Sequence, residues 1–510
     1  MEDHGAVDSR AARAATAIVA TVGVASLGSE IAGARLLAPY FGTSTIIWAN
    51  TIAVVLLSLS LGYWLGGRAA DRDPSLAGLC RLVLAAALLL ACVPFLAKPV
   101  LGLAVDALSS ISVGAFLGSL AAVLVLLALP LILLGAAAPY AVRLSVRSVE
   151  ESGRVTGRLY AISTVGSLVG VFSSSLLLIP FAGTRLTFLA YSLLLALVST
   201  VGFARRGLAA AAVIGVVALL PVGTIKAAEP GSSLLAEQDT EYGYARIVET
   251  PDGGRQLELN EGVAVHSLLR ADRGPLTGGY WDEIQVLPWS SDRGGKRPER
   301  ILILGNAGGT AARAFTMLDP RVEVDGVELD PKISELGRRW LGMPGGPRFT
   351  LHDGDARYFL RSSAGPWDAI VVDAYRQPYI PFHLATREFF AEAAKRLAPG
   401  GVVIVNVGHP ADDSGLERSL TATLRSVFPT VLRDPAQIEN TQLIAGNGAI
   451  SAEVLLGAAA EMPGAIRPIA VDAARRLEPG LDGGDVWTDD RAPVEWLVDL
   501  SIVKAAAAGG

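Results

Sequence analysis

The chain has 510 residues, enough for two or more domains, and a formal net charge of −6 at pH 7, which gives no indication of nucleic-acid binding. Hydrophobic residues make up 51% of the chain and the mean hydropathy is +0.44, which is high for a soluble protein. Both cysteines, Cys80 and Cys92, precede residue 228, which excludes a disulfide framework and a cysteine-based zinc motif from the second half.

The first half is predicted to be a helical membrane domain over residues 14–226, preceded by an N-terminal tail, residues 1–13. Long blocks of this half are nearly free of charge, and a helix needs about 20 mainly apolar residues to cross a bilayer. Small residues such as Gly166 and Gly170 suit close packing between such helices. We therefore expect a protein of the cell membrane, with the lipid bilayer as a partner. The sequence predicts about seven spans, near 14–36, 45–66, 80–102, 115–140, 158–180, 184–204 and 207–225.

Basic residues between these stretches predict an orientation. They gather in alternate loops, and positive charge stays on the cytoplasmic side of a membrane. This rule places the N-terminus inside the cell and, after seven spans, residues 228–510 outside. The stretch 207–225 is short, rich in alanine and interrupted by Pro221, and an even number of spans would reverse that result. The loops carry Arg68, Arg72 and Arg81; then Arg143, Arg147, Arg154 and Arg158; then Arg205 and Arg206.

A linker is predicted over residues 227–240, and a small β-domain is predicted after it, over residues 241–290. The residues 244–249 and 256–259 flank the turn Pro251-Asp-Gly-Gly254. Short β-prone runs around a glycine-containing turn are typical of a β-hairpin.

Residues 299–332 predict a nucleotide-binding unit. Glycines let the backbone approach a ligand closely, a helix amino terminus offers free N–H groups, and an acid about 20 residues on, here Glu328, can accept both hydroxyls of a ribose. The alternative is an ordinary strand–turn–helix connection without a ligand. The parts are the apolar strand 301–304, the glycines Gly305, Gly308 and Gly309, a helix over 310–318, and a second strand over 322–329.

The strands and helices that follow predict a Rossmann-like, doubly wound parallel sheet of the methyltransferase type over residues 291–510. Ligands of such sheets bind at the carboxyl ends of the strands, where Glu328, Asp355 and Asp373 are expected. Each could simply cap a helix or stabilise a turn. As a set, they predict a site in which Glu328 holds a ribose, Asp355 faces an adenine and Asp373 lies beside the reacting atom.

These motifs resemble the spermidine synthase (polyamine aminopropyltransferase) family. The similarity covers about residues 240–410, and the whole chain resembles the bacterial membrane-fused branch of that family. The combined pattern is specific, although each motif alone is not. It comprises the hairpin, the glycine turn, VELDP at 327–331, DGDARYFL at 353–360, VVDAY at 371–375 and IPFHLATREFF at 380–390, with TDDRAPVEWL at 488–497 resembling the end of the membrane-fused branch.

The resemblance implies transfer of an aminopropyl group from decarboxylated S-adenosylmethionine to an amine such as putrescine, with release of methylthioadenosine. It implies neither a metal nor a prosthetic group, and it leaves open whether the chain forms a homo-oligomer. A carboxylate base helps this reaction, because a free alkylammonium has a pKa of roughly 10. The implied roles are catalysis by Asp373, co-substrate binding by Gly305, Gly309, Glu328, Asp355 and Ala356, and amine binding by Tyr280, Tyr375, Arg376 and Pro381.

Three positions depart from the family pattern. Gly308 stands where the family usually carries an acid that binds the aminopropyl ammonium. Arg376 stands where a second acid usually follows the catalytic one, and its charge is wrong for a diamine. The pair Tyr280-Trp281 replaces a Tyr-His or Tyr-Gln pair. We therefore expect adenosyl binding, together with poor use of putrescine.

Two alternatives remain from the sequence. One is an S-adenosylmethionine-dependent enzyme of other chemistry, such as a methyltransferase, on the same fold. The other is a transporter whose second half is a nucleoside-sensing module.

The expected side of the catalytic half is the cytoplasm, because the implied co-substrate is made there and its fixed charge prevents passive crossing, although loop charges with seven spans favour the outside.

Overall fold

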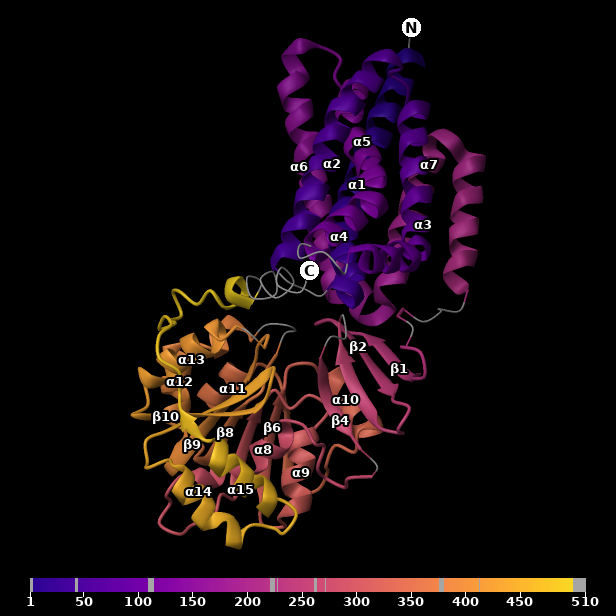
Figure 1. The fold of residues 1–510 in the computed structure, drawn as a ribbon. Coiled ribbons are helices and arrows are strands. Elements are labelled where there is room, and N and C mark those ends of the chain that lie inside the picture. The colour runs from indigo at the N-terminus through magenta and orange to yellow at the C-terminus, as the bar shows by residue number, and fades with distance from the viewer. Residues whose placement is uncertain are drawn as a thin grey trace. The chain divides into compact units, whose positions relative to one another are not determined.

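A computed structural model describes residues 3–41, 45–108, 114–220, 225–226, 228–260, 264–270, 272–375, 380–411 and 413–498 (Figure 1). The chain divides into two compact units, one helical and one of mixed α/β structure. The helical unit is made mainly of residues up to Ala227, and the α/β unit mainly of residues from Ala228 onward.

Long helices form the helical unit. The first begins at Asp3, so the expected tail of residues 1–13 is largely helical; alanine-rich sequence favours this continuation. Two π-helical turns, Leu124–Ala128 and Ser174–Leu178, join α4 to α5 and α6 to α7. The helices are α1 Asp3–Phe41, α2 Thr45–Arg72, α3 Leu76–Leu108, α4 Gly114–Val123, α5 Leu129–Ser145, α6 Val149–Ser173 and α7 Ile179–Leu219.

Within the described ranges, five helical stretches are long and apolar enough to cross a membrane: Ala11–Phe41, Ile47–Arg72, Leu76–Val105, Leu117–Ser145 and Val149–Leu219. The last has 71 residues and leaves helical geometry at Gly183 and at Phe203. These two breaks fall at the ends of the predicted spans 158–180 and 184–204. The number of times the chain crosses a membrane stays a prediction, and residues 221–224 of the stretch 207–225 lie outside the described residues.

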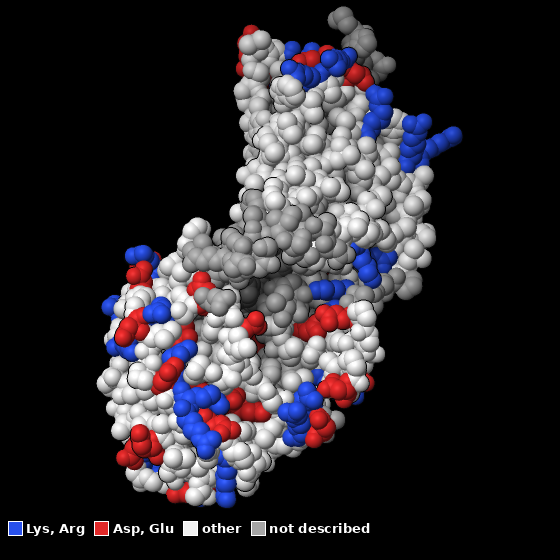
Figure 2. All heavy atoms as spheres, in the orientation of Figure 1, with Lys and Arg blue, Asp and Glu red and all other residues white. Residues whose placement is uncertain are grey.

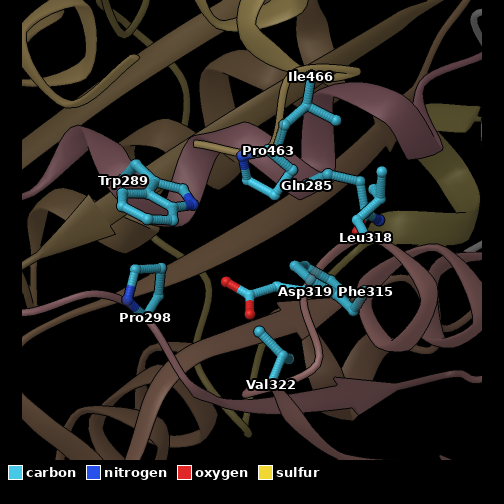
Figure 3. A pocket seen from close by; sticks show the side chains of 9 residues that line it. All are labelled: Gln285, Trp289, Pro298, Phe315, Leu318, Asp319, Val322, Pro463 and Ile466. Carbon is cyan, nitrogen blue, oxygen red and sulfur yellow. The ribbon is translucent and has the colours of Figure 1, made fainter. Parts of the chain in front are cut away.

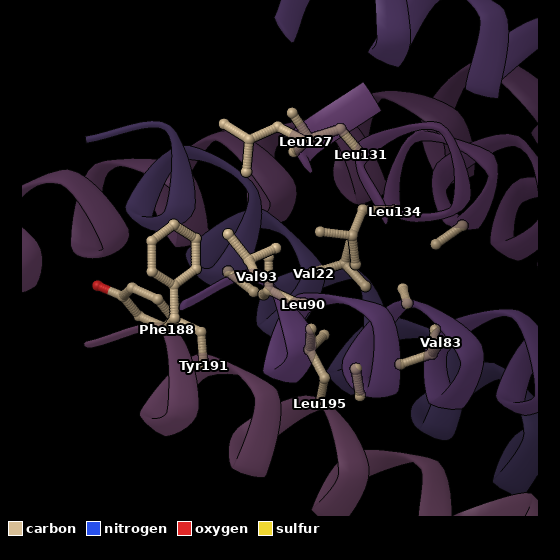
Figure 4. Close-up of a cluster of buried hydrophobic side chains, with 14 of the residues drawn as sticks. Val22, Val83, Leu90, Val93, Leu127, Leu131, Leu134, Phe188, Tyr191 and Leu195 are labelled. Atoms are coloured by element: carbon tan, nitrogen blue, oxygen red, sulfur yellow. The ribbon is translucent and has the colours of Figure 1, made fainter. Parts of the chain in front are cut away.

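Glycines bring α1 and α6 together, as the sequence predicts. A Cβ atom at Gly166 would collide with the carbonyl oxygen of Ala20, and one at Gly170 with that of Val24. Large apolar side chains from several other helices fill the centre of the unit, among them Leu90 of α3 (Figure 4). The helical unit is therefore held by close backbone approach on one side of α1 and by a packed apolar core on others.

The small β-domain is a four-stranded sheet with the order β1-β2-β3-β4. The predicted hairpin is present: β2 pairs with β3 in antiparallel fashion around the turn 250–254. The expected linker 227–240, in contrast, contains β1. Its polar composition hides the strand, but Leu235 and Ala236 pack against the core of this sheet. The strands are β1 Ser233–Asp239, β2 Tyr244–Glu249, β3 Arg255–Leu259 and β4 Val265–Leu269.

An eight-stranded sheet forms the centre of the α/β unit, with the order β12-β10-β11-β9-β8-β5-β6-β7. The Rossmann-like prediction is confirmed over the five parallel strands β7, β6, β5, β8 and β9. Strands β11, β10 and β12 extend this sheet in antiparallel fashion. The strands are β5 Arg300–Leu304, β6 Glu323–Glu328, β7 Phe349–Asp353, β8 Trp367–Val372, β9 Leu397–Gly408, β10 Thr430–Gln437, β11 Asn440–Gly446 and β12 Glu478–Pro479.

Alternate residues of the central strands face opposite layers of helices, because side chains of a strand alternate between its two faces. Leu302 packs into the same core as Phe389 of α12, whereas Ile303 packs into the core that contains Ala312 of α9. Both faces of the sheet are therefore buried, as its apolar strands predict. The helices are α8 Trp281–Val286, α9 Thr310–Leu318, α10 Pro331–Trp340, α11 Ala356–Ser362, α12 Arg387–Ala394, α13 Gly415–Arg425, α14 Ala452–Ala458 and α15 Arg467–Arg476.

The strand order reverses between β5 and β8. From β5 the chain continues outward to β6 and β7 on one side, and it then returns to β8 and β9 on the other. In open α/β sheets, ligands bind outside the carboxyl ends of the strands at such a reversal. Glu328 at the end of β6 and Asp373 just after β8 lie at this edge of the sheet.

Candidate active site

The glycine turn after β5 brings two strand ends into contact. Gly305 has a φ of 93°, in the left-handed region, and a Cβ atom there would collide with the carbonyl oxygen of Asp373. Gly309 has a φ of 88° and precedes α9, and a Cβ atom there would lie 2.7 Å from Cγ of Met343. Both positions therefore require glycine. Whether they also contact a co-substrate stays a prediction.

Glu328 holds the glycine turn from the end of β6. Its Oε2 accepts a hydrogen bond from the backbone N–H of Ala307 at 2.8 Å, and its Oε1 accepts one from that of Asp330 at 3.0 Å. Ala307 itself has a φ of 45°, an unusual value for a residue other than glycine. Burial raises the pKa of Glu328 to about 7. Each carboxylate oxygen keeps a second lone pair, so the geometry is compatible with the predicted ribose hydroxyls.

Asp355 caps helix α11, which was the simple alternative that the sequence left open. Its Oδ1 accepts a hydrogen bond from the N–H of Tyr358 at 2.9 Å. Its Oδ2 lies 3.1 Å from Nε2 of His383, a residue to which the sequence assigned no role although it lies in the motif at 380–390. Ala356, the first residue of α11, is buried. The proposed contact between Asp355 and an adenine stays a prediction.

Asp373 lies half-buried just after β8 with a hydrogen-bond donor on each side. Tyr280 donates its hydroxyl to Oδ2 at 3.0 Å, and Nδ2 of Asn406 donates to Oδ1 at 2.7 Å. Burial raises the pKa of Asp373 to about 7, against the opposing effect of these two hydrogen bonds. The result is a carboxylate that can take up and release a proton near neutral pH. Asn406 has no assigned role in the sequence, although an asparagine inside an apolar strand was a usable signal.

The other predicted amine-binding residues lie at different places around this carboxylate. The hydroxyl of Tyr375 donates to the carbonyl oxygen of Asn406 at 3.0 Å and accepts from the N–H of Gly408 at 2.6 Å. The ring of Tyr280 stacks on Trp281, with 4.3 Å between ring centroids. Pro381 is half-buried and precedes a 3₁₀ turn, Phe382–Leu384. Arg376 lies outside the described residues.

Position 308 has no room for the acid that the family usually carries there. A Cβ atom on Gly308 would collide with the side chain of Leu341 and would lie 2.9 Å from Cβ of Ser267. The N–H of Gly308 instead donates to Oγ of Ser267 at 2.8 Å. Leu341 and Ser267 thus occupy the space that an acidic side chain at position 308 would need. A substitution at this position alone therefore does not recreate the family arrangement.

A buried arginine of α11, Arg357, bonds to Asp489 in the C-terminal motif at 488–497. Arg357 of α11 is 7% exposed, and its Nη1 donates to Oδ1 of Asp489 at 2.7 Å and to the carbonyl oxygen of His383 at 3.1 Å. Glu392 of α12 accepts two more hydrogen bonds from the same guanidinium. Thr386 also donates to Asp489, at 2.7 Å. Residues 383–386 are therefore bonded both to α11, through Arg357, and to Asp489, which the motifs at 353–360 and 488–497 did not reveal.

A small cavity is lined by Gln285, Trp289, Asp319, Pro463 and neighbouring residues, and none of the predicted site residues lines it (Figure 3). On the face shown in Figure 2, basic and acidic side chains of the α/β unit are interspersed. No group of three or more His, Cys, Asp or Glu in the described part of the chain is placed to hold a metal ion.

Comparisons with known proteins match this part of the chain. Residues 279–437 match the family described as the spermine/spermidine synthase domain. A probable polyamine aminopropyl transferase of Bifidobacterium longum is 31% identical over 52% of this chain and 62% of its own length. Putrescine N-methyltransferase 1 of Nicotiana tabacum is 31% identical over 38% of this chain and 51% of its own length. The chain thus spans between half and two thirds of these two curated relatives.

Among solved structures, a probable spermidine synthase from Corynebacterium glutamicum aligns with 50% of this chain and 98% of its own, at 22% identity and a TM-score of 0.39. The sequence match over residues 279–437 includes Tyr280, the glycine turn, Glu328, Asp355 and Asp373. These residues therefore lie in the part of the chain that matches the spermine/spermidine synthase domain, and the curated relatives of the chain include polyamine aminopropyltransferases.

Proposed function

We propose that the protein is a membrane-anchored aminopropyltransferase that uses decarboxylated S-adenosylmethionine and an amine. The observation that carries this proposal is the set of surroundings that the structure gives Asp373. This aspartate lies beside the glycine turn, accepts hydrogen bonds from Tyr280 and Asn406, and has a pKa raised to about 7 by burial. A general base with a pKa near the working pH is well matched to removing a proton from an amine.

In the proposed reaction Asp373 is the base. The acceptor ammonium gives one proton to Asp373, and the neutral nitrogen attacks the carbon beside the sulfonium. A carbon–nitrogen bond forms as the carbon–sulfur bond breaks, and the electron pair of that bond stays on sulfur, so methylthioadenosine leaves as a neutral thioether. Tyr280 and Asn406 hold the carboxylate in place for the proton transfer. Alignment of the two substrates contributes much of the remaining rate.

The nucleoside half of the site is assigned to the carboxyl ends of β5, β6 and β7. Glu328 takes the ribose hydroxyls, while Gly305 and Gly309 let the backbone approach the co-substrate. Asp355 and Ala356 lie at the adenine, and His383 shares the carboxylate of Asp355 at 3.1 Å. The amine half comprises Tyr280, Tyr375, Pro381 and Arg376. These assignments rest on the family pattern together with the positions of the described residues at one edge of the sheet.

Poor use of putrescine is part of the proposal. A diamine carries a second ammonium, which needs a partner far from the base. Arg376 stands where the family usually carries a second acid, and its positive charge repels an ammonium instead of binding it. We therefore propose an acceptor amine other than putrescine.

The helical unit is proposed to anchor the enzyme in the cell membrane. Large apolar side chains are exposed along it, for example Leu56 at 59% and Leu176 at 61%, and much of its surface on the face shown in Figure 2 carries no charge. Such a surface is suited to lipid. We place the catalytic half in the cytoplasm, where the co-substrate is made.

A second candidate is methyl transfer to an amine from S-adenosylmethionine itself, which the similarity to a putrescine N-methyltransferase favours. Nucleoside products separate the two reactions. The full-length protein is incubated with an amine panel and either decarboxylated or intact S-adenosylmethionine. Methylthioadenosine from the decarboxylated form is the expected product. S-adenosylhomocysteine from the intact form, without methylthioadenosine, would establish the methyltransferase instead.

A further inference from the structure

Hydrogen bonds between two side-chain amides, Gln442 on β11 and Asn406 on β9, lead to Asp373 just after β8, and we call this set the amide relay. Gln442 lies directly opposite Asn406 in the antiparallel pairing of β11 with β9. Its Nε2 donates to Oδ1 of Asn406 at 2.7 Å, and Nδ2 of Asn406 donates in turn to Oδ1 of Asp373 at 2.7 Å. Oδ1 of Asn440, two residues before Gln442, accepts from the same Nε2 at 2.8 Å. Asn406 and Gln442 are 3% and 1% exposed, so water does not compete for these bonds.

Each amide in this relay is oriented by the next. An amide has one oxygen that accepts and one amino group that donates. Because Gln442 presents a donor to the oxygen of Asn406, the amino group of Asn406 faces Asp373. The reverse orientation would place two oxygens within hydrogen-bond distance of each other without a proton between them. Oε1 of Gln442 is buried and has no hydrogen-bond partner among the described residues, which is rare in native proteins.

We propose that Gln442 is a positioning residue for the transfer reaction: it turns Asn406 so that a hydrogen-bond donor faces Asp373 and keeps this carboxylate ionised and aimed at the acceptor amine. This inference rests on the proposed function of Asp373. Gln442 acts through Asn406 and has no hydrogen bond of its own with the base. With Tyr280 on one oxygen and Asn406 on the other, lone pairs stay available on Asp373 for the incoming proton.

The electrostatics around Asp373 support this role. The hydrogen bond from Asn406 lowers the pKa of Asp373, against burial, which raises it. The titratable groups that interact with this carboxyl in the described region are the phenols of Tyr280, before α8, and Tyr375, after β8. Burial raises the pKa of both phenols, so they stay neutral while the carboxyl titrates. Loss of the donor on Asn406 would therefore raise the pKa of Asp373.

The test uses Gln442→Met in the full-length protein, since methionine keeps the length of the side chain and removes its donors. We expect the acidic limb of the pH profile of kcat/KM to move about one pH unit higher. At pH 7, kcat should fall about fivefold, because the ionised fraction of Asp373 falls from about one half to about one tenth, and it should approach the wild-type value at pH 9. The KM for the co-substrate should change little, because the relay lies on the amine side.

Gln285→Met is the matched control. Gln285 is 2% exposed and also has a buried Oε1 without a partner among the described residues. Its Nε2 donates to the backbone oxygens of Trp281 and Ala311, and it has no bond with the relay. A purely structural effect would be similar in both variants. An unmoved limb in Gln442→Met, or an equal shift in Gln285→Met, would overturn the proposal.

Asn440→Ala covers the case in which Gln442→Met does not fold. It removes the acceptor that orients Gln442 at the half-buried end of the relay. Gln442 can then turn its oxygen toward Asn406, so the same limb should move in the same direction by a smaller amount. A folded Asn440→Ala protein with the wild-type profile would contradict the relay.

A direct titration separates this proposal from the proposed function. The infrared carboxyl band of Asp373, identified by its loss in Asp373→Asn, is followed against pH in the ligand-free protein. Its midpoint should be higher in Gln442→Met than in wild type, whether or not the wild type transfers an aminopropyl group. An unchanged midpoint would refute the relay, whereas a raised midpoint in a protein without transferase activity would refute only the proposed reaction.

Discussion

Glu328, which is buried, and Asp373, which is half-buried, have carboxyl groups with the same raised pKa, about 7, and different surroundings. Glu328 receives backbone N–H groups of the glycine turn, which suits a residue that holds a ligand. Asp373 receives donors from the side chains of Tyr280 and Asn406, which suits a base. The neighbours of each carboxyl, rather than its pKa, therefore separate the two roles.

Glu328→Gln tests the ribose contact. The substitution removes the negative charge of the carboxylate and one of its two acceptor oxygens. A lost charge-assisted hydrogen bond costs about 1.5–3 kcal/mol, so we expect methylthioadenosine to bind about ten- to a hundred-fold more weakly. In wild type, binding should strengthen as pH rises through about 7, because ribose hydroxyls donate to the ionised carboxylate; the variant should lose this dependence. Calorimetry measures both. Glu323→Gln, at the exposed start of the same strand, serves as the control, and equal affinities in both variants would exclude the assignment.

Gly308→Asp tests whether packing accounts for the missing acid. The new side chain would collide with Leu341, so we expect a loss of stability of about 1–3 kcal/mol, typical of overpacking, and no gain in putrescine use. Gly345→Asp is the control, because a Cβ atom there meets open space. Adding both Leu341→Ala and Ser267→Gly to Gly308→Asp removes the two clashing side chains, and this triple variant should bind decarboxylated S-adenosylmethionine more tightly than wild type. Efficient use of putrescine by the wild type would contradict the account.

At the scale of elements, the hydrogen bonds of Arg357 and Asp489 hold residues 383–386 against α11. Asp489→Asn weakens two hydrogen bonds to this buried guanidinium, at 2.7 and 2.8 Å. We expect a loss of about 1–2 kcal/mol, at the lower end for charged groups because Asp489 is half-exposed. Thermal unfolding measures the change. Asp490→Asn, at the exposed neighbouring position, should have no such effect, and indistinguishable melting temperatures would refute the anchoring role.

The parallel strands were predictable because their apolar runs, buried on both faces, end in glycine turns or acids. Strand β1 was not, since only Leu235 and Ala236 mark its buried contacts within polar sequence. The relay was not predictable either. Asn406 and Gln442 meet only through the antiparallel register of β9 with β11, and an antiparallel extension of a parallel sheet leaves no local pattern. Predictions succeeded where a strand is apolar and ends in a recognisable turn, and they failed for a strand with polar sequence and for a contact that depends on the pairing of two strands.

For the whole molecule, the side of the catalytic half decides whether the proposed co-substrate reaches it. Green fluorescent protein becomes fluorescent when it folds in the cytoplasm. Because we place the catalytic half there, we predict that a fusion of green fluorescent protein to the C-terminus is fluorescent. An alkaline phosphatase fusion at the same site should be inactive. The breaks at Gly183 and Phe203 allow an even or an odd number of crossings, so the loop charges alone do not decide the outcome. A dark fluorescent fusion with an active phosphatase would place the catalytic half outside.

The central claim is that Asp373 takes the proton in an aminopropyl transfer. The most direct measurement uses decarboxylated S-adenosylmethionine with a labelled aminopropyl group and follows the label into an amine. We predict that the labelled amine and methylthioadenosine form in equal amounts, and that kcat/KM rises with pH through about 7 as Asp373 ionises. In Asp373→Asn, turnover should fall by about a hundred-fold with methylthioadenosine binding little changed. Methylthioadenosine without label in any amine, or equal turnover in variant and wild type, would contradict the account.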